Sequence, residues 1–262
     1  MSKIRDLNIY TQRMKRGLQD KLFFIPYLNK LSQSFIFIDY GCADGTLIDI
    51  ILHYYPQSVC IGLDCNEDML SLAKEKCFTY YNTRVFFCKT FEELKELLLG
   101  FSNNMKIFNM SSVLHEVHHY NDSKEIERFY QDVQSLSADY IFIRDMYNGN
   151  KKWNDISPDT YTKLSTHPLL KSQIQDFESH FGSIMEKKNC THFLLKYKYL
   201  ENWNREVEEN YFPDIPLQYF ERNYDCEFRK EYQLAYFTKL WKEELNIKID
   251  SNTHIQLIYK KK

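Results

Sequence analysis

The sequence predicts an α/β protein in which helices cover both faces of a seven-stranded, mostly parallel sheet. Two observations support this fold class. Short runs rich in aromatic and β-branched residues alternate with segments in which apolar side chains recur at helical spacing. The first such run, Ser34 to Asp39, is almost continuously apolar, which is typical of a strand buried on both faces of a parallel sheet.

The predicted elements follow one another at a steady pace. We expect parallel strands at residues 34–39, 58–63, 83–88, 105–110 and 138–143. We expect intervening helices at residues 46–55, 66–77, 91–99 and 122–136, the second of them N-capped by Asn66. Two closing strands, at 226–235 and 253–259, flank a helix at 236–245 and complete the sheet.

The domain organisation follows from where this alternation begins and loosens. Residues 1–32 should form a helical N-terminal cap, with a break near Pro26. Residues 33–262 should form one domain. Within it, residues 147–200 carry clusters of Asn, Gly, Lys, Ser and Pro, and after 191 their apolar spacing is helical again. We expect this part to be an insertion after the fifth strand that serves as a lid or forms part of the substrate pocket.

Composition and charge exclude several classes of protein. The formal net charge of −2 gives no global attraction to nucleic acid phosphates. Seven cysteines, an odd number without C-x-x-C spacing, argue for reduced thiols rather than a disulfide framework. No apolar run is long enough to span a membrane, and the start lacks the apolar core of a signal peptide. We therefore expect a soluble, cytoplasmic protein without membrane partners.

The turn after the first strand, Asp39-Tyr-Gly-Cys-Ala-Asp-Gly45, carries the most specific pattern. The chain has only seven glycines, and Gly41 and Gly45 both stand in this turn. They let the backbone turn tightly and approach a ligand closely, with a helix N-terminus beyond. Asp64 ends the second strand, where an acidic side chain is placed to accept hydrogen bonds from the two hydroxyls of a ribose.

This pattern resembles the first motif of the class I (Rossmann-like) S-adenosylmethionine-dependent methyltransferases, acidic-x-G-x-G-x-G. It stands here as Asp39, Gly41, Ala43 and Gly45, and many members of the family share the change of the middle glycine to alanine. The rival interpretation is a dinucleotide-dependent dehydrogenase, but the leading acidic residue and the short loop favour the methyltransferase. The resemblance covers about residues 33–145 and implies S-adenosyl-L-methionine as the cofactor.

The resemblance also assigns the cofactor site residue by residue. The turn, including Cys42, would surround the amino acid part of the cofactor, and Asp64 would bind the ribose. Further residues expected around adenine, or between cofactor and substrate, are Cys65, Met69, Lys89, Thr90, Asn109 and Ser111. The acidic residue that the family often places after strand three is missing, which leaves the adenine contacts open.

A second pattern, His115-Glu-Val-His-His119, matches the H-E-x-x-H signature of zinc proteases. It begins just after the fourth strand, and Asn121-Asp122 predicts a turn and an N-cap directly behind it. A long zinc-binding helix therefore has no room. In position the pattern resembles the Leu-His-acidic element of small-molecule methyltransferases, whose His is a general base. We expect His115 and Glu116 to be catalytic, without a resident metal.

Three alternatives stay open at this point. In the first, His115 would only pack beside the cofactor or form a hydrogen bond with a backbone carbonyl. In a metal-assisted RNA methyltransferase, the cluster of His115, Glu116, His118 and His119 would ligate the metal, although the E-x-x-E-H spacing of such enzymes is not reproduced. From another class, the chain would be a catalytically silent cofactor-binding subunit of a partner.

We expect methyl transfer to an O or N nucleophile, with a small molecule as substrate and RNA as the alternative. The N/D-P-P-Y/F tetrapeptide of exocyclic-amine and protein-glutamine methyltransferases is absent, since Asn109-Met-Ser-Ser stands in its place. Arg144 and Asp145, at the end of the fifth strand, are either aimed at the cleft or paired with each other at the sheet edge.

Overall fold

The computed structural model describes residues 17–31, 34–149 and 154–262. The chain divides into two compact units. Of the described residues, the sheet unit comprises 17–31, 34–145, 215–229 and 256–262, and the helical unit comprises 146–149, 154–214 and 230–255. Residues 1–16 and 32 of the expected cap, and 150–153 of the expected insertion, lie outside the described residues, so the cap and the insertion stay predictions.

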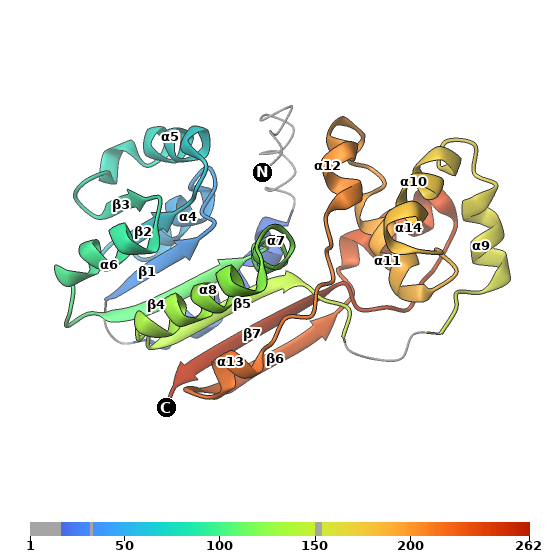
Figure 1. Cartoon of the computed structure of the whole chain (residues 1–262). Helices are drawn as coiled ribbons and strands as arrows, with labels where there is room; N and C mark the ends of the chain where they lie inside the picture. Colours follow the sequence, from blue (N-terminus) through green and yellow to red (C-terminus); the bar gives the residue numbers. More distant parts are fainter. Residues whose placement is uncertain (1–16, 32–33, 150–153) are drawn as a thin grey trace. The chain divides into compact units, whose positions relative to one another are not determined.

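Seven strands form one sheet in the order β3-β2-β1-β4-β5-β7-β6 (Figure 1). Their bounds are β1 Phe35–Tyr40, β2 Val59–Leu63, β3 Val85–Cys88, β4 Met105–Ser111, β5 Tyr140–Met146, β6 Tyr224–Tyr232 and β7 His254–Lys261. Strands β1 to β5 pair in parallel, and β7 runs against them (Figure 1). The predicted seven-stranded, mostly parallel sheet is confirmed.

The register of the parallel strands brings polar residues to one edge of the sheet. Asp39 of β1 lies opposite Gly62 of β2 and Asn109 of β4. Two residues further along β4, Ser111 lies opposite Arg144 of β5. The carboxyl ends of these strands therefore form a single edge, which is where ligands bind in open α/β sheets.

The helices of the sheet unit follow the predicted order. They are α2 Leu18–Lys21, α3 Ile25–Leu28, α4 Thr46–Tyr54, α5 Glu67–Lys76, α6 Phe91–Leu99, α7 Leu114–Tyr120, α8 Ser123–Ser135 and α13 Gln218–Glu221, with a 3₁₀ turn at Phe78–Tyr80. Asn66 caps α5 as expected, since its side chain accepts hydrogen bonds from the backbone N–H groups of Asp68 and Met69. Pro26 lies in the first turn of α3, so the predicted break falls just before it.

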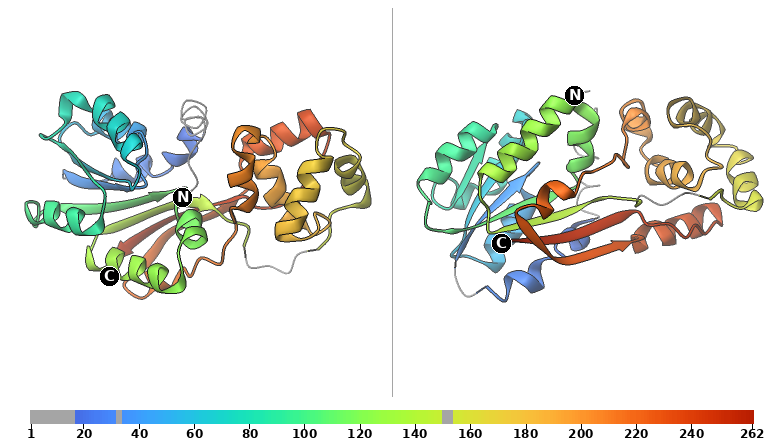
Figure 2. Two further views of the ribbon diagram at one scale, coloured as in Figure 1. Left: turned by 45° about the horizontal axis from the view of Figure 1, so that its top comes forward. Right: turned by 60° about the horizontal axis from the view of Figure 1, so that its bottom comes forward.

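Helices cover both faces of the sheet, because alternate side chains of each strand point to opposite sides. Figure 2 shows α3 (blue) and α8 (green) on opposite faces of the sheet. On the α3 side, the ring of Phe24 lies 5.6 Å from that of Phe37 and 5.0 Å from that of Phe142, measured between centroids. On the other side, Phe129 of α8 packs 5.2 Å from Tyr40.

The helical unit has its own apolar core, which includes Phe177, Phe193 and Trp241. Its helices are α9 Pro158–Ser165, α10 Lys171–Phe181, α11 Lys187–Lys196, α12 Trp203–Glu208 and α14 Ala235–Leu245, with a 3₁₀ turn at Leu200–Asn202. In the described parts of the chain, no helix is both long and apolar enough to cross a membrane. No disulfide joins any of the seven cysteines, all of which lie in the described ranges.

Several predicted boundaries are wrong, among them the end of the fifth strand, which is expected at residue 143 but lies at Met146. The strand expected at 226–235 ends at Tyr232, because the backbone N–H of Leu234 donates to the hydroxyl of Thr253 and α14 begins next to it. The helical stretch expected after residue 191 is split into α11 and α12. The buried ammonium of Lys196 donates to the carbonyl oxygens of Glu206 and Glu209, which turns the chain back on itself.

Candidate functional site

The turn after β1 has an unusual backbone. Gly41, Ala43 and Gly45 all adopt the left-handed conformation, with φ of 73°, 46° and 70°. The backbone N–H groups of Gly41 and Cys42 both donate to the carbonyl oxygen of Leu63, at 2.7 and 3.1 Å. The turn is thereby tied to the end of β2, and α4 begins directly behind it.

Asp64 holds this turn from the side of β2. Its Oδ2 accepts the backbone N–H of Ala43 at 2.9 Å, and its Oδ1 accepts that of Asn66 at 2.9 Å. An ionised carboxylate has about four acceptor positions, so Asp64 can accept further hydrogen bonds while it keeps these two. The residue predicted to bind a ribose therefore also fixes the loop predicted to surround the rest of the cofactor.

The two glycines of the turn are needed for space as well as for conformation. A Cβ on Gly41 would lie 2.8 Å from Cγ2 of Val113, at the start of α7, and a Cβ on Gly45 would lie 3.0 Å from the Cβ of Ala73 in α5. The turn is packed between two helices at these points.

Replacing Ala43 with glycine should stabilise the protein. A left-handed alanine costs roughly 1 kcal/mol, and the greater freedom of glycine in the unfolded chain returns part of it, so we expect a gain of about 0.5 kcal/mol. Urea unfolding followed by circular dichroism measures it. Ala73→Gly, in the interior of α5, is the control and should lower stability by about 1 kcal/mol or more. A loss of stability in Ala43→Gly would show that the left-handed backbone of Ala43 is not strained.

A buried carboxylate and two unpaired oxygens lie at the carboxyl ends of β1 and β4. The side-chain N–H of Asn109 donates to Oδ1 of Asp39 at 2.7 Å. Burial raises the pKa of Asp39 to about 7. In the described parts of the chain, Oδ1 of Asn109 and Oγ of Ser111 are buried without a hydrogen-bond partner. Buried polar groups are normally paired, so these two point to a ligand.

The N-terminal helices bring two charges into this site that sequence analysis missed. Asp20 accepts a hydrogen bond from Nε of Arg144 at 2.7 Å. Lys21 is half-buried, and desolvation, together with Arg144, lowers its pKa to about 8 although Asp39 opposes this. In the ranges that the structure describes, the Lys21 ammonium forms no hydrogen bond. No local motif marks Asp20 or Lys21, because both stand in an ordinary helical pattern.

The strongest contacts of the site join α7 to the end of β5. Oδ2 of Asp145 accepts the backbone N–H groups of Val113 at 3.0 Å and Leu114 at 2.6 Å, and Oδ1 lies 2.6 Å from Nδ1 of His115. Both His115 and Asp145 are buried. Arg144 pairs with Asp20, and Asp145 pairs with His115.

Helix α7 contains the whole H-E-x-x-H match, and it is short, as expected. It ends at Tyr120, and Asp122 caps α8 with a capping box. Nε2 of His118 lies 2.8 Å from the hydroxyl of Tyr130. Glu116 and His119 are half-buried on the same helix.

The remaining predicted residues follow β2 and β3. Met69 is buried in α5, and Cys65 is exposed in the turn before it. Lys89 is exposed and pairs with Glu67. Thr90 caps α6, since its hydroxyl accepts the backbone N–H of Glu93. None of these contacts tests the predicted adenine site.

Comparison with known proteins bears on the fold. The structure is similar to that of the MccD protein. The match covers 94% of this chain and 98% of the MccD protein, with a TM-score of 0.51 and 12% sequence identity. The strand order 3-2-1-4-5-7-6 with a reversed β7 is that of the class I methyltransferases. The chain has the class I methyltransferase fold.

Other similarities to methyltransferase-fold proteins are local or distant. The chain is 45% identical over 49 residues to carboxy-S-adenosyl-L-methionine synthase 1 of Yersinia pseudotuberculosis, and it spans about a fifth of that relative's length. A S-adenosylmethionine-dependent methyltransferase from Archaeoglobus fulgidus matches 98% of the chain with a TM-score of 0.47 and 15% identity. No protein-family model matches the chain.

Proposed function

We propose that this chain is a methyltransferase that transfers a methyl group from S-adenosyl-L-methionine to an O or N nucleophile. The observation that carries the proposal is the pair of unpaired buried oxygens, on Asn109 and Ser111, beside the turn that Asp64 holds. The cofactor would supply an electrophilic methyl group on a sulfonium. The 49-residue similarity to a protein named for an S-adenosylmethionine derivative supports this cofactor.

The chain's own residues suit each part of such a cofactor. Asp64 would accept the ribose hydroxyls, as carboxylates at this position do in related folds. Asp39 and Oδ1 of Asn109 would accept hydrogen bonds from the ammonium group, and the positive charge of the ligand would favour the ionised form of Asp39. Lys21 would bind the carboxylate. The ammonium and the carboxylate of the cofactor would thus each meet a buried or half-buried partner of opposite sign.

His115 is proposed as the general base, with Asp145 as the residue that orients it. An ionised carboxylate can only accept hydrogen bonds, so Nδ1 carries the ring proton and Nε2 is the basic nitrogen of the neutral ring. Nε2 would take a proton from the nucleophile as the methyl is transferred. Glu116 follows on the same helix and is proposed to assist by binding substrate.

The substrate is proposed to be a small molecule, because the net charge of −2 offers no general attraction to RNA. RNA, and a silent cofactor-binding subunit, remain the alternatives. Calorimetric titration of the metal-stripped full chain with S-adenosylhomocysteine tests the proposal. Micromolar binding is the expected result, and no binding would overturn the proposed function.

A His115→Asn variant separates turnover from binding. The amide N–H of asparagine can still donate to Asp145, so the fold and the affinity for S-adenosylhomocysteine should stay within about threefold. Turnover should fall by about 10²–10⁴-fold, the usual loss when a general base is removed. Methylation of a panel of small molecules measures it, and His53→Asn, on an exposed site of α4, is the control. Unchanged turnover would remove His115 from the mechanism.

A further inference from the structure

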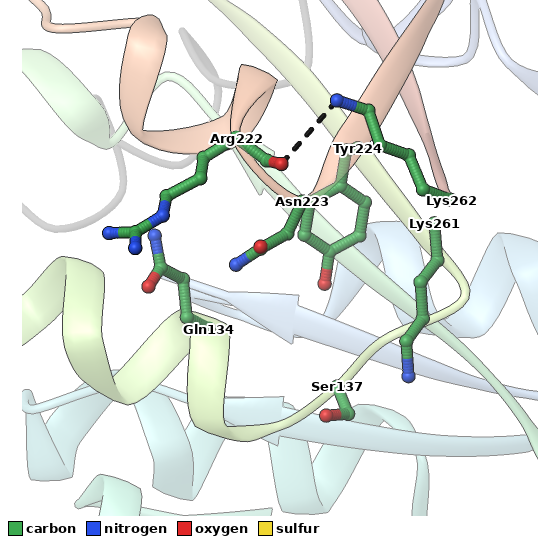
Figure 3. A pocket seen from close by; sticks show the side chains of 7 residues that line it. All are labelled: Gln134, Ser137, Arg222, Asn223, Tyr224, Lys261 and Lys262. Carbon is green, nitrogen blue, oxygen red and sulfur yellow. Dashed lines mark hydrogen bonds between the residues drawn. The ribbon is translucent and has the colours of Figure 1, made fainter.

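The sheet unit has a second polar site. It lies at the amino end of β5, whereas the proposed cofactor site lies at the carboxyl ends of the parallel strands. A hollow of about 280 Å³ is lined by Gln134, Ser137, Arg222, Asn223, Tyr224, Lys261 and Lys262 (Figure 3). The backbone N–H of Lys261 donates to the carbonyl oxygen of Asp139, just before β5 begins. Asp145 and Arg144, in contrast, stand at the carboxyl end of β5.

The hollow is strongly cationic. Three of its seven lining residues are basic and none is acidic. Across the described ranges, neither the guanidinium of Arg222 nor the ammonium of Lys261 forms a hydrogen bond or an ion pair. The ammonium of Lys262 donates to the carbonyl oxygen of Glu221 at 2.9 Å, which fixes it at the rim, and it lies 4.0 Å from a carboxylate oxygen of Asp225.

The hydroxyl of a largely buried tyrosine lines this hollow. Tyr224 is only 3% exposed, and its hydroxyl points toward Ser137, between the side chains of Asn223 and Lys261 (Figure 3). Among the described residues this hydroxyl has no hydrogen-bond partner. Burial, with a smaller contribution from Asp139, raises the pKa of Tyr224 to about 12, so the hydroxyl stays a donor at neutral pH. The hydroxyl is therefore available as a donor to a ligand in the hollow.

We propose that this hollow binds the phosphate group of a phosphorylated ligand. Arg222 offers a planar fork of donors that matches phosphate oxygens, Lys261 adds a point charge, and Tyr224 adds a neutral donor from below. The volume of about 280 Å³ lies just under the ~300 Å³ of the smallest typical ligand sites, so the hollow has room for a phosphate and for part of the group that carries it. The rest of the ligand would lie outside, on the exposed rim.

Titration of the full chain with inorganic phosphate, followed by calorimetry or ³¹P line broadening at low salt, tests this site. The wild type should bind saturably, and Arg222→Gln/Lys261→Gln should weaken binding by at least about tenfold. Tyr224→Phe should weaken it about threefold to tenfold while the ring stays in the core. Lys260→Gln is the matched control: it removes a charge from the same strand, but Lys260 faces Glu227 and does not line the hollow, so affinity should change less than twofold.

Two further probes separate the sources of the phosphate. Adenosine 5′-monophosphate that binds more tightly than phosphate alone, and loses this gain in Arg222→Gln/Lys261→Gln, indicates a small phosphorylated molecule. A short single-stranded RNA that binds more tightly than both, and more weakly as salt rises, indicates a phosphodiester. The absence of saturable binding for all three probes would overturn the proposal. An equal loss of affinity in Lys260→Gln and in the double variant would also overturn it, because binding would then depend on net charge alone.

Discussion

Asp64→Ala is expected to lower the affinity for S-adenosylhomocysteine by at least about 100-fold. The variant would lose two hydrogen bonds from ribose hydroxyls to a charged acceptor, at about 1.5–3 kcal/mol each, and about 1.4 kcal/mol corresponds to a factor of ten. It would also release the backbone N–H of Ala43, which Asp64 now accepts at 2.9 Å. Calorimetric titration of both proteins measures the loss.

The control for this experiment is Asp68→Ala. Asp68 is an exposed carboxylate in the first turn of the neighbouring helix α5, so the variant removes the same charge near the same place. Its affinity should stay within about twofold of the wild type. If Asp64→Ala also stays within that range, the ribose contact is disproved, and the role of Asp64 is confined to holding the turn.

Asp145→Ala is expected to lower the free energy of unfolding by about 3–5 kcal/mol, the usual cost of breaking a buried charged network by removing one partner. The variant would leave the backbone N–H groups of Val113 and Leu114, and the ring of His115, without their acceptor in a buried place. Urea unfolding followed by circular dichroism gives the difference from the wild type.

A second capping carboxylate provides the comparison. Asp122 caps α8 in an exposed capping box, and an N-cap replaced by alanine typically costs ~1 kcal/mol. Asp122→Ala should therefore be clearly less harmful than Asp145→Ala. Equal losses in the two variants would show that Asp145 contributes no more than an ordinary helix cap, and they would remove its proposed part in orienting His115.

The sequence by itself determined the layout of the sheet and the loop of the site. Strand and helix periods are local properties, and burial on both faces leaves an almost continuous apolar run such as Ser34 to Asp39. The turn from Gly41 to Gly45 could also be predicted from the sequence. A left-handed backbone, and the close packing of neighbouring side chains against it, both require glycine or the next smallest residue. Boundaries failed where side chains from distant segments ended an element, as Thr253 does at Leu234.

Only the tertiary structure decided the partners of the charged residues. Asp145 could not be assigned to His115, nor Arg144 to Asp20, because these pairs are 30 and 124 residues apart along the chain. Lys21 stands in an ordinary helical pattern, and only packing brings it beside Asp39 and lowers its pKa. Periodicity is set by neighbours in sequence, whereas desolvation and charge pairing are set by neighbours in space. The sequence therefore showed where the strands end, and folding decided which charges meet there.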